Sequence, residues 1–331
     1  MRYLTIGTDP VRRRRVSQIA LGAMLMGTVT DESTSYAILD RYVESGGTFI
    51  DTSNNYAFWI NGTQGGESEQ LLGRWLRSRG IGDELTIATK VGGRPPRPAT
   101  HLTEDLEGLS PRVIKESVAR SLEQLGRDRI DVYYAHVPDP AVPLEEQVEA
   151  FGTLVAEGTV GMVGLSNFWS WQIERARTMA AAAGLPGCDV LQHHHTYFRA
   201  RTDEGGLRSR DGSIGVVDGQ LLSYLRAEPG LTLVAYTPLL SGGYVRADKP
   251  LEALYDHAGT RARRVVLDQV VRETGATANQ VVLAWLMGGE LPIIPLVGAS
   301  SVAQLDESLA AAELELSEDQ RHRLDAAGHN D

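Results

Sequence analysis

The chain has 331 residues, of which 42% are hydrophobic and 23% charged, a composition typical of globular proteins. Its formal net charge of −11 at pH 7 argues against nucleic acid or an acidic membrane surface as a partner. The single cysteine, Cys188, excludes an intramolecular disulfide and a cysteine-based metal cluster.

The N-terminal segment Met-Arg-Tyr-Leu-Thr-Ile-Gly has no apolar core of the length found in signal peptides. No apolar run approaches the roughly 18 residues that a membrane-spanning helix needs. We therefore expect a cytoplasmic protein without a membrane partner. The basic run at 12–15 is interpreted as a solvated turn near the N-terminus.

Short apolar runs alternate with longer amphipathic segments along the whole chain. The short runs, bounded by glycines and polar residues, predict buried strands, and apolar residues at helical spacing predict helices. In chain order, the predicted strands cover 16–24, 48–51, 85–91, 130–136, 160–165, 190–193, 231–236 and 292–297. The predicted helices between and after them cover 33–45, 67–78, 110–125, 144–157, 170–183, 215–225, 260–274, 278–286, 302–311 and 317–324.

Eight strand–helix units in succession predict an α/β fold with a parallel sheet closed into a (β/α)8 TIM barrel. Because no segment has the composition of a linker, we expect a single domain over residues 1–331. The stretches 92–108, 199–214 and 241–260 are expected to be loops over the catalytic face.

Polar residues recur at the C-terminal ends of the predicted strands, where active sites of barrel enzymes are built. Asp51 ends the second strand, and Tyr56 follows a few residues later. Lys90 lies in the third strand and His136 ends the fourth. An acid and a phenol at one such end suggest that the phenol donates a proton and that the carboxylate supports it. This chemistry also needs a cation and an imidazole nearby.

Six motifs extend this pattern across nearly the whole chain. They are Gly-Gly-Thr-Phe-Ile-Asp-Thr-Ser-Asn-Asn-Tyr (46–56), Ile-Ala-Thr-Lys-Val (87–91), Asp-Val-Tyr-Tyr-Ala-His (131–136), Gly-Leu-Ser-Asn-Phe (164–168), Ala-Tyr-Thr-Pro-Leu (235–239) and Gly-Ala-Ser-Ser (298–301). With these motifs the chain resembles the aldo-keto reductase superfamily. The last turn and the long loop after the seventh strand look more like its bacterial and potassium-channel-β-subunit-like branches.

The resemblance implies a catalytic tetrad of Asp51, Tyr56, Lys90 and His136. A free phenol is a poor acid at neutral pH, but a nearby ammonium lowers its pKa by favouring the phenolate. In this scheme Asp51 holds Lys90 charged, Tyr56 is the general acid, and His136 donates a hydrogen bond to the substrate oxygen. A reduced nicotinamide supplies the hydride.

The same matching implies a cofactor site formed by Gly22, Ala23, Met24, Asp51, Ser166, Asn167, Gln192, Tyr236, Thr237, Pro238, Leu239, Ser241, Gly242, Gly298, Ser300, Gln304, Glu307 and Ser308. Tyr236 is expected to stack on the nicotinamide. The family commonly has Ser at position 237 and Asn at 308, so Thr237 and Ser308 are departures that keep a polar group. The 298–304 turn has no cation for the 2′-phosphate of NADP. That cation would have to come from Arg246, Lys249 or the arginines within 261–264. NADP(H) is favoured by family habit, and NAD(H) stays possible.

Aromatic residues beyond the strand ends, Phe58, Trp59, Trp169 and Tyr197, are expected to line the substrate cleft. The triplet at 193–195 invites a metal site, but consecutive strand residues point to opposite faces, so no metal is expected.

The sequence therefore predicts an NADP-dependent oxidoreductase that reduces a small-molecule aldehyde or ketone to an alcohol, with no oligomeric state assigned. One alternative is a nucleotide-sugar keto or 2,3-enoyl reductase of deoxysugar biosynthesis. Another is an NADP-binding regulatory or partner protein with little turnover.

Overall fold

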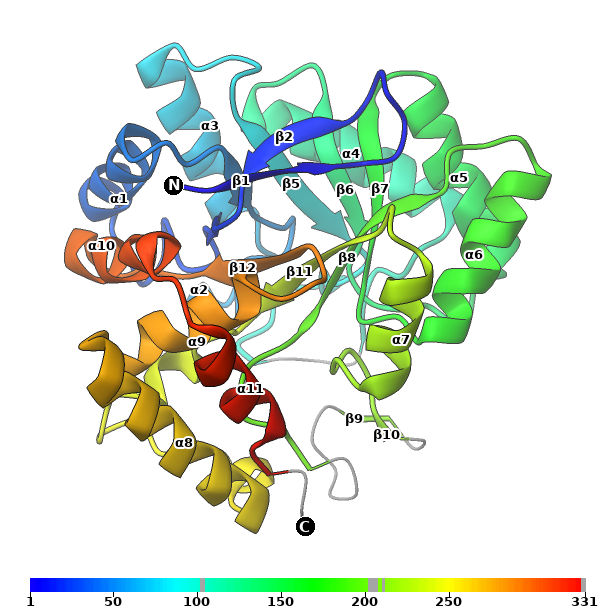
Figure 1. The fold of residues 1–331 in the computed structure, drawn as a ribbon. Coiled ribbons are helices and arrows are strands. Elements are labelled where there is room, and N and C mark those ends of the chain that lie inside the picture. The colour runs from blue at the N-terminus through cyan, green and yellow to red at the C-terminus, as the bar shows by residue number, and fades with distance from the viewer. Residues whose placement is uncertain (102–104, 202–207, 210–211, 329–331) are drawn as a thin grey trace.

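The computed structural model describes residues 1–101, 105–201, 208–209 and 212–328, and it contains a closed barrel of eight parallel strands (Figure 1). This confirms the predicted (β/α)8 architecture. Around the barrel the strand order is β11-β12-β3-β4-β5-β6-β7-β8. Their bounds are β3 Ala20–Gly22, β4 Phe49–Asp51, β5 Thr86–Val91, β6 Ile130–Ala135, β7 Val160–Ser166, β8 Cys188–His194, β11 Thr232–Tyr236 and β12 Ile293–Val297.

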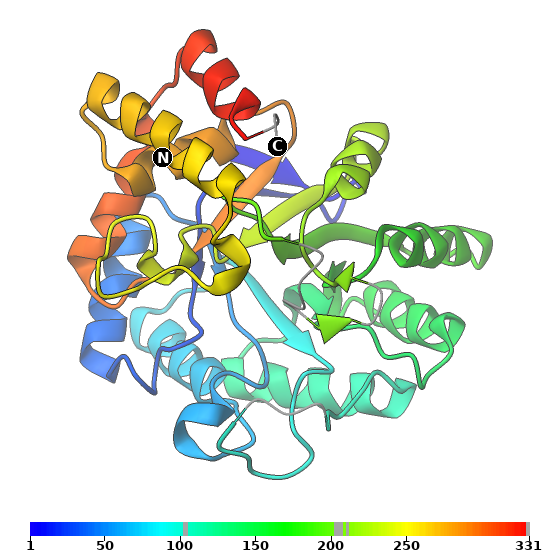
Figure 2. The same ribbon diagram turned by 90° about the horizontal axis from the view of Figure 1, so that it is seen from below.

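Helices form a ring around the strands, as the view along the barrel in Figure 2 shows. Those that the structure describes are α1 Glu32–Glu44, α2 Phe58–Asn61, α3 Glu67–Arg79, α4 Pro111–Leu125, α5 Leu144–Ala156, α6 Ser170–Ala182, α7 Gly219–Ala227, α8 Ala258–Thr274, α9 Ala278–Met287, α10 Val302–Ala310 and α11 Glu318–Ala326. Three 3-10 turns are η1 Leu240–Gly242, η2 Ala253–Tyr255 and η3 Ala311–Glu313. In the described part of the chain, no helix combines the length and apolarity needed to cross a membrane.

An antiparallel hairpin of β1 (Tyr3–Ile6) and β2 (Arg14–Ser17) crosses the N-terminal end of the barrel (Figure 1). The side chains of Ile6 and Val16 are buried against residues inside the barrel, including Phe49. The hairpin therefore seals the end opposite to the expected active site. A second short hairpin, of β9 (Arg208–Ser209) and β10 (Gly212–Ser213), lies between β8 and α7.

The predicted strand at 16–24 is wrong, because the chain turns between β2 and β3. Ser17 causes this break: its N–H donates to Thr48 Oγ1 at 2.8 Å, and its hydroxyl donates to Ile19 O at 2.9 Å. These contacts satisfy polar groups that a continuous strand would pair in a ladder.

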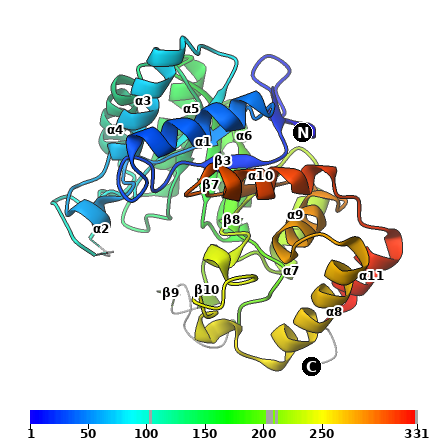
Figure 3. The same cartoon turned by 90° about the vertical axis from the view of Figure 1, so that its left-hand side faces the viewer.

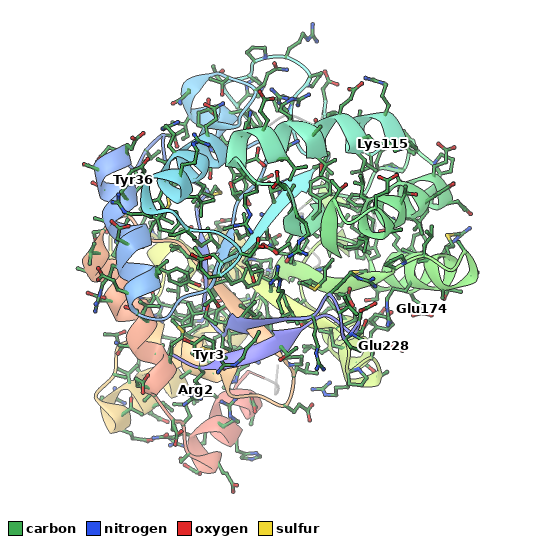
Figure 4. All side chains as sticks on the ribbon, turned by 90° about the horizontal axis from the view of Figure 1, so that it is seen from above. Arg2, Tyr3, Tyr36, Lys115, Glu174 and Glu228 are labelled. Carbon is green, nitrogen blue, oxygen red and sulfur yellow. The ribbon has the colours of Figure 1, made fainter. Side chains whose placement is uncertain are left out.

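The run at 12–15 is only partly the solvated turn that was expected. Arg14 and Arg15 lie in β2. The Arg14 guanidinium donates to the buried carboxylate of Asp131 at 2.9 Å. Arg15 stacks on the ring of Tyr3, 4.0 Å from its centroid. Figure 4 labels Tyr3. Two of the four arginines thus fasten the hairpin.

The predicted helix at 215–225 begins later, at Gly219. Residues 215–217 lie beside His194, whose N–H donates to Gly215 O at 2.7 Å and whose carbonyl accepts from Val217 N at 3.0 Å. Asp218 then caps α7 by accepting from Leu221 N at 2.8 Å. A side-chain cap at the first free N–H groups sets the helix start more strongly than the apolar spacing does.

The three expected loops leave the barrel after β5, β8 and β11. Residues 102–104 of the 92–108 stretch, and 202–207 and 210–211 of the 199–214 stretch, lie outside the described residues. The 241–260 stretch contains η2 and the start of α8.

The ring of helices closes where α10 lies beside α1 (Figure 3). Arg41 of α1 donates to Asp306 of α10 at 2.7 Å across this contact. On the strands below, β12 pairs with β3, with Leu21 opposite Val297. The first and last barrel units of the chain are therefore neighbours.

Tyr42 of α1 ties this helix to the strand that carries Asp51. Its hydroxyl oxygen lies 2.8 Å from both Ile19 O and Phe49 O, and 2.9 Å from Ser17 Oγ. The side chain is fully buried, so these backbone carbonyls have no access to water in its place.

We expect Tyr42→Phe to lower the free energy of unfolding by about 1–3 kcal/mol, because it removes a buried hydroxyl that donates to one of these carbonyls and accepts from Phe49 N. Tyr36→Phe, on the same helix but half-exposed, is the matched control and should change stability little. Chemical denaturation of both variants measures the difference. Equal stability of the two variants would contradict the structural role of the Tyr42 hydroxyl.

Candidate active site

The alternation of side chains along the barrel strands builds the candidate site. Phe49 and Ala88 belong to the apolar layer inside the barrel. Asp51 and Lys90 follow two residues later on the same strands, so they point inward one layer closer to the C-terminal end. Both side chains are almost completely buried.

Lys90 is the centre of the site because its ammonium uses all three of its N–H groups. It donates to Asp51 Oδ1, to Thr52 O at 2.8 Å and to Tyr56 Oη at 2.9 Å. The other oxygen of Asp51 accepts from Gln192 Nε2 at 2.8 Å. Three of the four predicted tetrad residues are thus joined directly.

Burial and neighbouring charges shift the pKa values of these three groups in opposite directions. Burial by itself lowers the pKa of Lys90, but the Asp51 carboxylate and the Tyr56 oxygen outweigh it, so the Lys90 pKa is raised and the ammonium stays charged. Burial raises the pKa of Asp51, which Lys90 and Gln192 oppose. Burial also raises the pKa of the Tyr56 phenol, and the Lys90 ammonium opposes that rise.

His136 completes the group from the end of β6. Its ring lies edge-on to Tyr56, with 6.0 Å between the centroids, and its Nδ1 lies 3.2 Å from Ser53 Oγ. Burial and the nearby Lys90 charge lower the pKa of His136 to about 3, so the ring is neutral at pH 7. Gly93 packs closely here, since a Cβ on it would lie 2.8 Å from that Nδ1.

Asn167 links the predicted cofactor residues to the tetrad. It has a left-handed backbone (φ 64°), and its amide donates to Ser166 Oγ at 3.1 Å and to His136 O at 3.0 Å. Its carbonyl accepts from Tyr236 Oη at 2.8 Å. The fold therefore brings together the residues predicted for the nicotinamide carboxamide and for ring stacking.

The loop after β11 has an unusual backbone. Thr237, Leu240 and Ser241 all have φ values between 50° and 53°, which residues other than glycine rarely adopt. Such conformations cluster at ligand-binding segments. The predicted residues Pro238, Leu239 and Gly242 belong to the same loop.

Some of the remaining predicted cofactor residues lie at exposed positions, and others are enclosed by neighbouring side chains. At the end of β3, Gly22 and Ala23 lie beside Asp51, and Met24 is 40% exposed. Beyond β12, nothing would obstruct a Cβ on Gly298, and the backbone and hydroxyl of Ser300 donate to Gln304 Oε1.

Glu307 and Ser308 occupy more enclosed positions on α10. Glu307 accepts from Thr277 Oγ1 at 2.7 Å, and Ser308 is 4% exposed. Glu307 therefore takes part in the contact between α10 and the start of α9, and Ser308 is buried on α10.

The aromatic residues predicted for the substrate cleft do not form one group. Trp59 and Trp169 are half-exposed, whereas Phe58 is buried edge-on against Trp59. Tyr197 is 1% exposed and packs against Phe198, Trp285 and the Arg263 guanidinium. Tyr197 is a core residue, which corrects the expectation that it lines a cleft.

The histidine triplet points to separate partners. His193 Nε2 lies 2.9 Å from Phe168 O, His194 Nε2 lies 2.5 Å from Tyr255 Oη, and His195 packs on Trp285. Within the described ranges, no three His, Cys, Asp or Glu side chains are arranged to hold a metal ion.

Sequence reasoning missed the polar residues between Asp51 and Tyr56. Ser53 donates to Asn55 Oδ1 at 2.7 Å, and Asn55 Nδ2 donates to Gly93 O at 2.8 Å. Asn54 donates to Glu107 at 2.8 Å, and Glu107 also accepts from Gly92 N, which ties the loop after β5 to the site. The sequence signal that could have revealed these contacts is the run of three short polar residues, 53–55, after a buried strand.

Comparison with known proteins bears on the family of the barrel as a whole. The family model described as Aldo/keto reductase family matches residues 18–329. The uncharacterized oxidoreductase YrpG of Bacillus subtilis is 31% identical over 329 residues, which cover 96% of this chain and 92% of that protein.

Two fungal proteins show a similar relationship. Norsolorinic acid reductase stcV of Emericella nidulans is 30% identical, covering 96% of this chain and 79% of its own length. Norsolorinic acid reductase of Aspergillus flavus is 28% identical, covering 95% and 78%. Since the family model spans almost the entire barrel, this chain belongs to the aldo/keto reductase family and is an oxidoreductase.

Proposed function

We propose that this protein is an NADP(H)-dependent reductase that converts an aldehyde or ketone to an alcohol, with Tyr56 as the general acid. The observation that carries the proposal is the buried Lys90 ammonium, which bonds Asp51 and lies 2.9 Å from the Tyr56 oxygen. The relatives named norsolorinic acid reductase support the reductive direction.

A nicotinamide cofactor, when bound, supplies the hydride that the carbonyl carbon receives. The residues of this chain donate a proton to the carbonyl oxygen and stabilise the charge that this transfer creates. Because Lys90 already donates to the Tyr56 oxygen, the Tyr56 hydrogen is free to point toward a substrate. As that proton leaves, the adjacent ammonium stabilises the phenolate.

Several features suit a nicotinamide dinucleotide. Ser166, Asn167 and Gln192 offer hydroxyl and amide groups beside the tetrad, and Tyr236 offers a ring face. At the other end, α10 begins after the open Gly298–Ser301 turn, and a helix N-terminus attracts phosphate. The stem of Arg246 lies against Gly242, in the loop proposed for the pyrophosphate.

We expect Tyr56→Phe to lower kcat for carbonyl reduction by about 10²–10⁴-fold, the usual contribution of a positioned general acid. NADPH affinity should stay nearly unchanged, because the phenol hydroxyl is proposed to serve the substrate. NADPH oxidation at 340 nm and fluorescence titration of NADPH measure the two quantities. Loss of cofactor binding, or retained turnover, would contradict the assignment of Tyr56 as the general acid.

Lys90→Met should reduce kcat at pH 7 by at least about 10²-fold, because the phenol loses the charge that supports its ionisation. Reduction needs protonated Tyr56, so activity falls as pH rises through the Tyr56 pKa. That pKa is already above 10.0 through burial, and without Lys90 the alkaline fall should move to higher pH. A fall that moves to lower pH would contradict this scheme. Lys115→Met, an exposed lysine labelled in Figure 4, is the control.

Arg246→Gln should weaken NADPH binding by roughly 10- to 100-fold, the value of one hydrogen bond to a charged group of about 1.5–3 kcal/mol. NADH, which lacks the 2′-phosphate, should bind as before. Arg112→Gln is the control, since Arg112 of α4 lies outside the predicted cofactor groups and pairs with Glu116 at 2.9 Å, as Arg246 pairs with Asp248. Equal binding of NADPH and NADH by the unmodified protein would refute the cofactor preference.

A further inference from the structure

We propose that arginines at the N-terminal end of the barrel form a binding site for a phosphate dianion, either free phosphate or the phosphate group of a small metabolite. The site is separate from the candidate active site, and the inference does not depend on the proposed reductase function.

The site is a polar cavity between the β1–β2 turn and the starts of β6 and β7. Its volume is about 110 Å³. One water needs roughly 10–15 Å³ of such space, so the cavity has room for several waters or for one small anion. This arginine pocket is lined chiefly by Arg12, Arg13, Arg14, Arg129, Asp131 and Gly161.

One buried carboxylate serves three guanidinium groups at the arginine pocket. Asp131 is 1% exposed, and its Oδ1 accepts from Arg14 Nη2 at 2.9 Å and from Arg129 Nη2 at 3.4 Å. Arg127 Nη2 lies 3.5 Å from Asp131 Oδ2, which already accepts from Ile87 N at 2.9 Å. The single carboxylate therefore balances only part of the positive charge around it.

The positive charge that remains matches a phosphate dianion. Asp9 pairs with Arg12 at 2.6 Å, and Asp83 pairs with Arg127 at 3.1 Å. Arg13 has no side-chain partner in the part of the chain that the structure describes. The four lining arginines and Arg127 carry five positive charges, and their three aspartate partners carry three negative charges. A phosphate group carries about −1.5 to −2 at pH 7, close to the surplus.

The arginines also have hydrogen-bond donors that the chain itself does not use. The Nε atoms of Arg12 and Arg129 are buried and have no hydrogen-bond partner among the described residues. Arg14 and Arg129 both contact Asp131 through Nη2, so the Nη1 groups of these two arginines are left over. Phosphate oxygens accept several guanidinium N–H groups at once, so a bound phosphate would pair donors that are otherwise unsatisfied.

The arginine pocket is distinct from the proposed cofactor site, because the two lie at opposite ends of the barrel. Asp131 stands at the start of β6 and His136 just beyond its end, roughly 16 Å apart at about 3.3 Å per residue. A phosphate in the pocket should therefore bind together with the cofactor. The small volume and the net charge of −11 favour a small anion over a nucleic acid or an acidic membrane.

The site is tested by calorimetric titration of the full chain at pH 7 with inorganic phosphate and with glycerol 3-phosphate. Saturating NADP⁺ keeps the proposed cofactor positions filled, and sodium chloride holds the ionic strength constant. We expect a Kd of about 1 mM or lower for at least one probe. Tighter binding of glycerol 3-phosphate would assign the pocket to a metabolite, and tighter or equal binding of inorganic phosphate to the free ion. Binding of neither probe would overturn the proposal.

Arg13→Gln should raise the Kd about tenfold, because it removes one charged donor. Arg13 is exposed and unpaired among the described residues, so this substitution should leave the fold intact. Arg129→Gln, at the opposite wall of the arginine pocket, should have a similar effect. Arg246→Gln is the matched control, since it removes the same charge from the loop after β11.

An unchanged Kd in both pocket variants would overturn the proposal. An equal rise in Arg246→Gln would also overturn it, since the phosphate would then bind at the cofactor site or respond only to net charge. Failure to bind NADP⁺ would reject the proposed reductase alone, because phosphate binding that depends on Arg13 would still support the arginine pocket.

Discussion

The site depends on the ammonium group of Lys90, which is completely buried. Lys90 emerges from an apolar layer, two residues after Ala88, and stays charged because Asp51 faces it from the neighbouring strand and the Tyr56 oxygen accepts from it. A buried charge that loses its partner is costly, so the two strand ends are fixed relative to each other. Tyr56 then takes its position from the ammonium, although it lies in a loop.

The cofactor side and the substrate side share a second polar group. The Asn167 amide contacts the backbone of His136 and also accepts from Tyr236. Its left-handed backbone and the absence of a side chain on Gly215 make this possible, since a Cβ there would lie 2.1 Å from Asn167 Oδ1. The groups proposed to hold the nicotinamide and the histidine expected to contact the substrate oxygen are therefore parts of one hydrogen-bonded unit.

The sequence predicted those features that follow from local periodicity. Alternation along β4 and β5 places Asp51 and Lys90 on the inner face, so the barrel and the positions of these two residues could be predicted from it. The roles of Tyr56 and His136 came from the resemblance to a known family. Errors arose where distant polar contacts decide the outcome, as where Thr48 interrupts the strand at Ser17. Tyr197 was misplaced because an aromatic after a strand has the same local pattern in a cleft and in the core. The Ser53–Asn55 contacts needed the position of Gly93, which no spacing rule supplies.

The N-terminal hairpin has a consequence for the order of assembly. It plugs the barrel with residues that precede every barrel strand, and β3, which follows it directly, keeps one edge unpaired until β12, the last barrel strand in chain order, arrives. Contacts between such distant segments form slowly, and an open strand edge can pair with another chain meanwhile. Without β12, the edges of β3 and β11 that it pairs with would both be open, and an open strand edge is a template on which another chain can pair.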